Sequence, residues 1–289
     1  MALSGALVEW LDLATLRLIA IKRRTGSDKQ TGHQPTGTQP VIVGERVWEE
    51  DGLLFAELSP VGFSLWRSIE LNLVRSIPDM FERPVLDLGC GDGVFCELAI
   101  GKAEYGVDLR EDLAEIVRPG VYGTVQQGDA VRGLDLPDNS IGTVFANSVL
   151  EHITQLDTAL SEFRRILRPG GRLIATVPAA AYYDGIALWM GEKASKRFHD
   201  SLDHVNLLTP AQWRERLDGL GYETELIREY FSPADGRFCR LISGSFVHNI
   251  ESRTGRMVFR LLRRRIVKAV KRSLDVTGGY CELVVAKKR

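Results

Sequence analysis

Short apolar segments alternate with helical stretches from residue 84 to residue 178, and this alternation restricts the fold more than any other feature of the sequence. The apolar segments occupy residues 85–88, 105–109, 123–127, 141–146 and 172–177. Their length suits strands that are buried on both faces, and the stretches between them suit crossover helices. The pattern predicts an α/β fold with a doubly wound, mostly parallel sheet and helices on both faces.

The sequence on either side of this segment predicts further parts of the same domain. Residues 41–83 are expected to form an N-terminal helical cap, in which Ser64 caps a helix that carries Leu65, Ile69, Leu73 and Ile77. Residues 84–178 form the expected core, and residues 179–289 complete the domain. Within this last part we predict an irregular stretch at 179–210, a helix at 211–220, and strands at 223–227 and 280–286.

The two ends of the chain have compositions of their own. Residues 1–24 carry apolar residues at helical spacing, which predicts an amphipathic N-terminal helix. Residues 25–40 are rich in Gly, Thr, Gln and Pro, which predicts a flexible linker. Residues 256–274 predict a C-terminal basic helix with an apolar side, eight Lys or Arg residues and no acid. Such a helix suits an anionic membrane surface, the core of its own domain or RNA, and the sequence leaves these three open.

Composition and charge argue against several classes of protein. The 289 residues carry a net charge of −1, which makes a general nucleic-acid binder unfavourable. The four cysteines lack the spacing of zinc ligands, so no metal is predicted. The apolar N-terminal segment contains Glu9 and Asp12 and is followed by basic residues, which reverses the charge order of a signal peptide. We expect a cytoplasmic protein, peripheral to the inner face of a membrane if the basic helix binds lipid.

The first predicted strand runs into a glycine-rich turn, Gly89-Cys90-Gly91-Asp92-Gly93. In a doubly wound sheet, ligands bind at the carboxyl ends of the strands, where glycines let them approach the backbone. The dinucleotide pattern is G-x-G-x-x-G, but here the spacing is G-x-G-x-G, and Val94 stands where the third glycine would be. The flanking acids Asp87 and Asp92 would repel a pyrophosphate, and they suit a ligand with an ammonium group and a sulfonium.

Two more acids follow the next two predicted strands. Asp108 lies about 20 residues beyond the glycine turn, at the position that binds a ribose diol in doubly wound folds. Asp129 follows the third strand, and its carboxylate can accept a hydrogen bond from an adenine amino group. With the glycine turn, these acids predict a site for a nucleoside that carries cationic groups.

Six motifs in order, VLDLGCGDG, GVDL, GDA, LPDNS, NSVLEHI and LRPGGRL, resemble those of the class I S-adenosylmethionine-dependent methyltransferases. The resemblance is to the branch that acts on small molecules and lipids, including quinone-biosynthesis enzymes. It covers residues 84–178, with a weaker echo at 204–222, and implies a Rossmann-like fold with S-adenosylmethionine as the methyl donor. One departure is Gly142, which stands where the family usually has an acidic residue opening the fourth strand.

The resemblance also assigns residues to the donor. It implies that Asp87, Gly89 and Gly91 line the methionine part. Asp108 would hold the ribose, Asp129 and Ala130 the adenine, and Asn147 would lie beside the sulfonium. Cys90 and Leu109 complete this predicted donor site, with Cys90 expected to be an inert thiol chosen for its size.

The acceptor is less well defined than the donor. The segment Asn147-Ser148-Val149-Leu150 lacks the Asn/Asp-Pro-Pro-aromatic turn of resembling enzymes that methylate planar amino groups. We therefore predict transfer to an oxygen, less readily a carbon, of a small-molecule or lipid-like acceptor. A methyltransferase of RNA or protein and a non-catalytic binding module of the same fold remain alternatives. A hydroxyl acceptor needs a base, and His152 and His204 are the catalytic candidates, with purely structural roles as the alternative. Residues 179–289 would supply a lid over this site, with Tyr182, Tyr183 and Trp189 either lining it or packing in the core.

Overall fold

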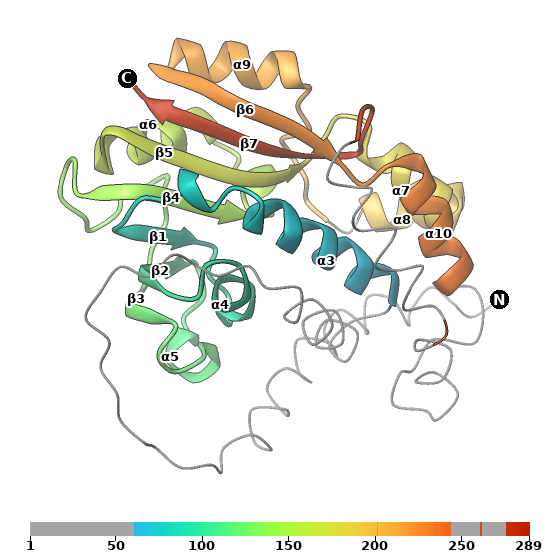
Figure 1. Cartoon of the computed structure of the whole chain (residues 1–289), viewed down its shortest axis with the longest axis horizontal. Coiled ribbons are helices and arrows are strands. Elements are labelled where there is room, and N and C mark those ends of the chain that lie inside the picture. Colours follow the sequence, from blue (N-terminus) through green and yellow to red (C-terminus); the bar gives the residue numbers. More distant parts are fainter. Residues whose placement is uncertain (1–60, 201, 244–260, 262–275) are drawn as a thin grey trace.

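The computed structural model describes residues 61–200, 202–243, 261 and 276–289, and its centre is a seven-stranded sheet (Figure 1). The strands follow the order β3-β2-β1-β4-β5-β7-β6 across the sheet. Their bounds are β1 Val85–Leu88, β2 Ala103–Asp108, β3 Tyr122–Gln127, β4 Ile141–Asn147, β5 Leu167–Pro178, β6 Tyr222–Tyr230 and β7 Cys281–Lys288. Each strand predicted from the sequence is present, with its ends shifted by a few residues.

Strands β1 to β5 pair in parallel, and β7 pairs antiparallel with both β5 and β6. The sheet is therefore mostly parallel, as predicted. In the register, Leu88 lies opposite Val107 of β2 and Ala146 of β4. The residues that follow these three positions, Gly89, Asp108 and Asn147, are consequently brought to one edge of the sheet.

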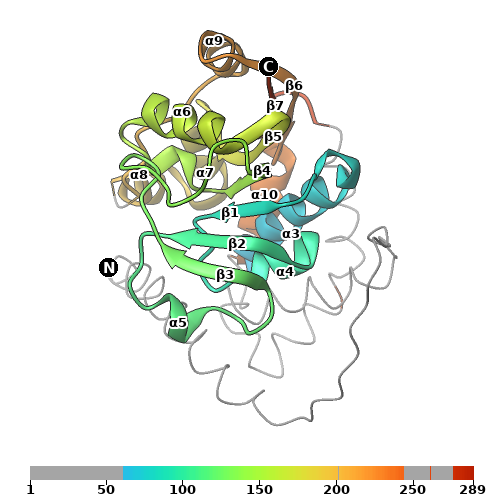
Figure 2. The same cartoon turned by 90° about the vertical axis from the view of Figure 1, so that its left-hand side faces the viewer.

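The helices cover both faces of the sheet. Their bounds are α3 Val61–Arg75, α4 Val94–Ile100, α5 Leu113–Ile116, α6 Leu156–Ile166, α7 Tyr182–Met190, α8 Glu192–His199, α9 Pro210–Gly219 and α10 Pro233–Ser243, with short 3-10 turns η1 Pro78–Met80 and η2 Leu150–His152. Figure 2 shows α6 on one side of the sheet and α3 and α4 on the other.

Alternating strand residues divide the interior into two cores. Phe145, Ile174 and Val285 pack with α3, α4 and α7 on one face. Their neighbours along the same strands, such as Val144 and Leu173, pack with α6 and α9 on the other face. Because successive side chains of a strand point to opposite faces, strands buried on both sides must be apolar throughout. This explains why the apolar runs of the sequence are continuous.

Helix α9 begins where its sequence requires. Thr209 Oγ1 accepts from Gln212 N, Gln212 accepts in return from Thr209 N, and Pro210 occupies the first turn. This capping box supplies partners for backbone amides that have none inside the helix. The predicted helix at 211–220 is confirmed.

Two local expectations were wrong. Ser64 lies within α3, so it does not cap that helix. The stretch 179–210 is not irregular throughout, because it contains α7 and α8. Helix α7 is largely apolar, so the sequence has no polar face there to reveal helical spacing. Helix α10 was also missed.

Packing explains why residue 142 is a glycine and not the acidic residue that the family usually has there. A Cβ atom at this position would lie 2.4 Å from the backbone oxygen of Glu82. The next residue, Thr143, donates from Oγ1 to the same oxygen at 2.9 Å and accepts from Glu82 N at 2.8 Å. The segment that leads into β1 therefore lies where a side chain on residue 142 would have to go.

Several predicted segments lie outside the described residues: the helix at 1–24, the linker at 25–40, the first part of the cap at 41–83, and the basic helix at 256–274 apart from Leu261. Within the described part of the chain, no helix combines the length and apolarity needed to cross a bilayer.

Candidate functional site

The candidate site lies at the carboxyl ends of β1, β2 and β4. Strand β1 pairs with β2 on one side and β4 on the other, so chain connections leave in opposite directions at this point. Such a switch in strand order opens a crevice in which doubly wound proteins bind their ligands. The glycine turn follows β1, and the segment that begins with Asn147 follows β4.

The glycine turn needs glycine for two different reasons. Gly89, Gly91 and Gly93 all have positive φ, a conformation that other residues adopt at a cost. A Cβ on Gly89 would lie 2.3 Å from Val149 Cγ2, so the turn packs directly on the segment after β4. A Cβ on Gly91 would meet no atom of the described residues within 4 Å. Among these residues, the backbone at Gly91 faces space that a ligand can enter.

Asp108 is held in place by the same turn. Its Oδ2 accepts from Gly91 N at 2.9 Å, and its Oδ1 accepts from Arg110 N at 3.1 Å. Each carboxylate oxygen has a second lone pair, so both retain capacity for a ligand hydroxyl. Next to it, Leu109 is 68% exposed, which is unusual for a leucine and offers an apolar surface beside the acid.

Asp129 and Ala130 follow β3 at the same edge. Asp129 Oδ1 accepts from Val131 N at 2.9 Å, and its Oδ2 lies 3.5 Å from Arg132 Nε. Ala130 is buried. These local contacts fix the direction of the Asp129 carboxylate.

Asp87 differs from the other acids because it is buried. Tyr122 donates a hydrogen bond from its hydroxyl to Asp87 Oδ2, and that ring packs against Gly93 and Gly106. Burial raises the pKa of Asp87 to about 7, against the opposing effect of the Tyr122 hydrogen bond. Cys90 is also buried, and burial raises the pKa of its thiol well above the ordinary range. This agrees with the expectation of an inert thiol.

Asn147 ends β4 with a fixed side chain. Thr176 Oγ1 donates to Asn147 Oδ1 at 2.8 Å, and Thr176 is fully buried. This hydrogen bond orients the amide and leaves its nitrogen as a donor at the carboxyl edge of the sheet.

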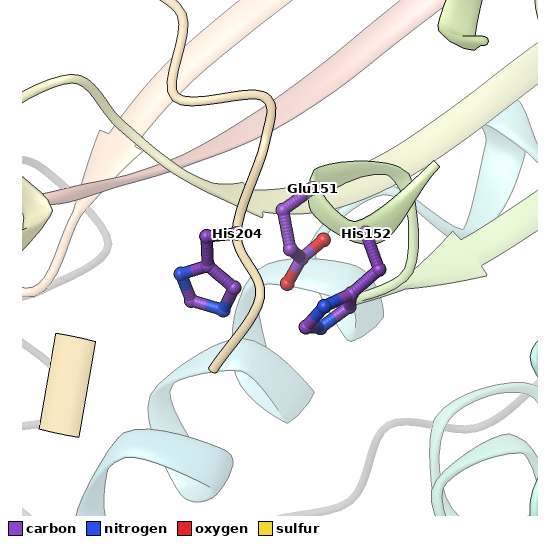
Figure 3. A group of neighbouring side chains, drawn as sticks. All are labelled: Glu151, His152 and His204. Atoms are coloured by element: carbon purple, nitrogen blue, oxygen red, sulfur yellow. The ribbon is translucent and has the colours of Figure 1, made fainter. Parts of the chain in front are cut away.

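The two candidate histidines come together on the segments that follow β4 and α8. The His152 and His204 ring centroids are 4.9 Å apart. Glu151, which the sequence analysis did not single out, places its carboxylate between the two rings (Figure 3). Ligand atoms of the three residues all lie within 4.8 Å of one another. We call these three residues the Glu-His-His cluster.

Backbone hydrogen bonds position this cluster. Val205 N and Asn206 N both donate to the carbonyl of Glu151, at 2.8 and 3.2 Å. The Asn206 side chain donates to the carbonyls of Leu150 at 2.9 Å and Ile153 at 2.7 Å. The segment that carries His204 is therefore fastened to η2, which carries the other two residues.

The cluster combines a buried acid with an accessible imidazole. Burial raises the pKa of Glu151 to about 8, and the nearby Glu70 acts in the same direction. His152 is more exposed, but partial burial still lowers its pKa, against the effect of a hydrogen bond to the Asp203 backbone. His152 is thus neutral at neutral pH and able to accept a proton.

A second group of residues supports the segment after β4 and was missed from the sequence. Glu70 is fully buried in α3 and accepts from Arg67 at 2.6 Å and from the Tyr230 hydroxyl at 2.7 Å. Ser148 donates to Glu70 at 3.3 Å and accepts from Arg67 at 3.2 Å. The only sequence signal for Glu70 was that an acidic residue stands beside the apolar positions of a predicted helix. Nothing in the sequence placed Arg67 or Tyr230 beside Ser148.

The aromatic residues after β5 have different roles. Tyr182 is 1% exposed and packs with Trp66 at 5.7 Å between ring centroids, so it belongs to the core. Tyr183 is only partly buried, and its hydroxyl lies 3.1 Å from His204 Nδ1. Trp189 lies in α7, but its side chain is outside the described part of the structure.

Comparisons with known proteins agree with this geometry. Residues 86–175 match the family model of a methyltransferase domain. Malonyl-[acyl-carrier protein] O-methyltransferase of Yersinia pestis is 30% identical over 133 residues, which are 45% of this chain and 49% of that protein. Ubiquinone biosynthesis O-methyltransferase of Xanthomonas oryzae is 28% identical over 150 residues, 49% of this chain and 59% of that protein. The chain thus spans about half the length of the curated relatives it matches.

Solved structures share the fold. An S-adenosylmethionine-dependent methyltransferase of Thermotoga maritima, described as a possible histamine N-methyltransferase, aligns with a TM-score of 0.52 at 18% identity and covers 83% of this chain and 95% of its own. The ordered motifs and the family match agree, so residues 86–175 are a methyltransferase domain of the class I type, for which S-adenosylmethionine is the methyl donor.

Proposed function

We propose that this chain transfers a methyl group from S-adenosylmethionine to the hydroxyl oxygen of a small-molecule or lipid-like acceptor. The observation that carries the proposal is the Glu-His-His cluster, which lies directly after the strand that ends in Asn147. An amine acceptor needs only to be neutral, whereas a hydroxyl must lose its proton as it reacts. A cluster of proton-binding groups at this place is therefore best explained by an oxygen acceptor.

The donor would occupy the crevice between β1 and β4. In this arrangement Asp108 accepts hydrogen bonds from both ribose hydroxyls, and Leu109 packs against the adenine. Asp129 accepts from the adenine amino group beside Ala130. Gly89 and Gly91 leave room for the methionine part, whose ammonium group is attracted by Asp87, and Cys90 fills the turn. Asn147 then lies beside the sulfonium.

Methyl transfer is a direct displacement, so the chain's main contribution is position. The acceptor oxygen, the methyl carbon and the sulfur must lie in line at close contact, which removes the entropy cost of bringing them together. As the new carbon–oxygen bond forms, the carbon–sulfur bond breaks and S-adenosylhomocysteine leaves as a neutral thioether. The Glu-His-His cluster promotes the loss of the hydroxyl proton on the acceptor side.

The curated relatives are consistent with an oxygen acceptor. Both relatives described above are named as O-methyltransferases. Their names point to different acceptor molecules. They therefore support an oxygen nucleophile without indicating which molecule contains it.

A methyl-transfer assay with fractionated extracts tests the proposal. The full chain is incubated with isotope-labelled S-adenosylmethionine and separate pools of polar metabolites, lipids, RNA and protein. We expect label in the polar or lipid pool, in a product that resists mild base, because an ether survives conditions that hydrolyse a methyl ester. The Asp108→Asn variant, whose donor binding is weakened, should label the same pool more slowly when S-adenosylmethionine is below saturation. Label in RNA or protein alone would overturn the proposal, and label in an amine would do the same.

A further inference from the structure

We infer that Glu151, His152 and His204 form a binding site for one divalent transition-metal ion, at which the acceptor hydroxyl coordinates. Two imidazoles and one carboxylate are a recurrent ligand set for catalytic metals that keep a position open for substrate. The inference about the metal rests on this cluster alone, and the role of the metal in activating the acceptor rests on the proposed function. No metal was expected from the sequence, because the ligands come from two segments far apart in the chain.

The geometry of the Glu-His-His cluster is close to that of a bound site. The ligand atoms lie within 4.8 Å of one another. In a tetrahedral zinc site with bonds of about 2.0–2.1 Å, ligand atoms are roughly 3.3 Å apart. Small rotations of the three side chains would bring the ligand atoms this much closer. The backbone that carries them is already held in place by hydrogen bonds from Asn206 and Val205.

Glu151 gives the second observation. It is 2% exposed, and its Oε2 is buried without a hydrogen-bond partner among the described residues. Buried carboxylate oxygens are normally paired, because their desolvation is costly. The nearby Arg67 is bonded to Glu70 instead. A cation held between Glu151 and the two imidazoles would satisfy this oxygen.

Both histidines have the second contact that metal ligands need. Metal-binding histidines usually donate their other ring nitrogen to a protein group, which fixes the orientation of the ring. The Tyr183 hydroxyl lies 3.1 Å from His204 Nδ1, and His152 has a hydrogen bond to the Asp203 backbone. In the metal-bound form, the Tyr183 hydroxyl oxygen would accept a hydrogen bond from His204 Nδ1, and His204 Nε2 would coordinate the ion.

The ligand set selects the ion and its chemistry. Imidazole favours Zn²⁺, Fe²⁺ and Ni²⁺ over Mg²⁺ and Ca²⁺, which prefer oxygen ligands throughout. His152 is exposed, so the acceptor can reach the fourth position from solvent. Coordination lowers the pKa of the hydroxyl, its O–H bond breaks, and the proton passes to water. The remaining electron pair on oxygen attacks the methyl carbon, and the carbon–sulfur bond breaks.

Zinc binding tests the site without any acceptor. The full chain is stripped with a chelator and titrated with Zn²⁺ and with Mg²⁺ by calorimetry, and Co²⁺ binding is followed by visible absorption. We expect one Zn²⁺ per chain, weak Mg²⁺ binding, and a Co²⁺ spectrum typical of nitrogen and oxygen ligands. Glu151→Gln and His204→Ala should each weaken Zn²⁺ binding by more than the roughly 10–100-fold that loss of an outer-shell partner costs, because each removes a direct ligand.

Glu282→Gln is the matched control. Glu282 is also fully buried, its carboxylate oxygens also lack hydrogen-bond partners among the described residues, and burial raises its pKa to about 8. It belongs to no His-containing metal group in the described part of the chain. Glu282→Gln should therefore leave Zn²⁺ affinity unchanged. Thermal melting and S-adenosylmethionine binding show whether each variant is folded.

The outcomes separate the metal site from the proposed function. Absence of stoichiometric Zn²⁺ binding, or equal affinity in folded wild type and cluster variants, would overturn the metal site. Zn²⁺ binding at the cluster without methyl transfer to any hydroxyl would retain the site and overturn the function. Methyl transfer to a hydroxyl that persists unchanged in chelator would retain the function and remove the metal from it.

Discussion

Two aspartates near the ends of neighbouring strands, Asp87 and Asp108, differ in burial and therefore in what they contribute. Asp87 lies buried with Tyr122, whereas Asp108 is partly exposed and holds the backbone of the glycine turn. We expect the ionised, buried Asp87 carboxylate to destabilise the fold and to attract the ammonium group of the donor. Asp108 should contribute through direct hydrogen bonds.

The pH dependence of stability tests the role of Asp87. Its pKa of about 7 in the folded chain exceeds the ordinary value of 3.8, so folding favours the protonated form. Its contribution to stability is therefore greatest below about pH 4 and falls as the pH rises towards about 7. The Asp87→Asn variant should be more stable than wild type at pH 8, by on the order of 1–4 kcal/mol, and similar to it near pH 4. It should nevertheless bind S-adenosylmethionine more weakly.

Urea unfolding at several pH values measures this difference. A variant that is less stable than wild type at pH 8 would show that Asp87 is ionised and paired in the fold, contrary to its buried position.

The sequence predicted the acids of the donor site because each ends or follows a strand at a fixed place in an ordered pattern. Glu151 was missed, although it lies directly before His152, because its burial depends on Asn206 and the segment around it. Glu70 and Arg67 were missed for the same reason: their partners Ser148 and Tyr230 come from other elements. Contacts between segments distant in sequence leave no local pattern.

At the scale of elements, the segment around Glu82 is fitted to the start of β4. Gly142→Ala should therefore destabilise the chain by about 1–3 kcal/mol, because its Cβ would meet the Glu82 carbonyl at 2.4 Å. Gly219→Ala in α9 is the matched control, since nothing lies within 4 Å of its added Cβ. That variant should be neutral or slightly stabilising. Chemical denaturation compares the two, and equal stabilities would contradict the packing described for Gly142.

The segment that carries His204 should act as a positioning element. Asn206 holds it to η2 through two hydrogen bonds to backbone carbonyls. Asn206→Ala should reduce kcat by about tenfold or more while the Kd of S-adenosylmethionine stays within about twofold, because a small displacement of His204 misaligns the site. Ser161→Ala, which removes an exposed side-chain hydrogen bond to the backbone of α6, is the control. Loss of donor affinity in Asn206→Ala would place this segment in the donor site instead.

The elements themselves were predicted to different degrees. Strands β1, β4 and β5 contain continuous apolar runs, which suit strands buried on both faces, whereas the edge strand β3 is more polar and partly exposed. Helices α7 and α10 pack on each other and on the same core as α3, and neither could be recognised from local spacing. Their positions depend on strands β6 and β7: β6 follows α7 and leads into α10, and β7 returns to the sheet after α10 (Figure 1).

At the scale of the whole molecule, the basic segment at 256–274 lies outside the described residues, so its membrane association stays a prediction. If it binds an anionic surface, the full chain should pellet with vesicles of anionic lipid at low salt and dissociate as salt is raised. Replacing Arg263, Arg264 and Arg265 with Glu should abolish sedimentation while donor binding is retained. A chain that fails to pellet at low salt, or a shift of RNA with steep salt dependence, would remove the membrane interpretation.

We propose that the donor binds in the crevice at the carboxyl ends of β1, β2 and β4, with Asp108 on its ribose. Calorimetric titration of S-adenosylmethionine into the full chain tests this most directly. We predict micromolar binding, about −7 to −8 kcal/mol, and a loss of about 1–3 kcal/mol in Asp108→Ala. Glu223→Ala, which removes an exposed acid from the edge strand β6, should bind as wild type does. Binding that is unchanged in Asp108→Ala, or tight binding of NADH in place of S-adenosylmethionine, would contradict the account.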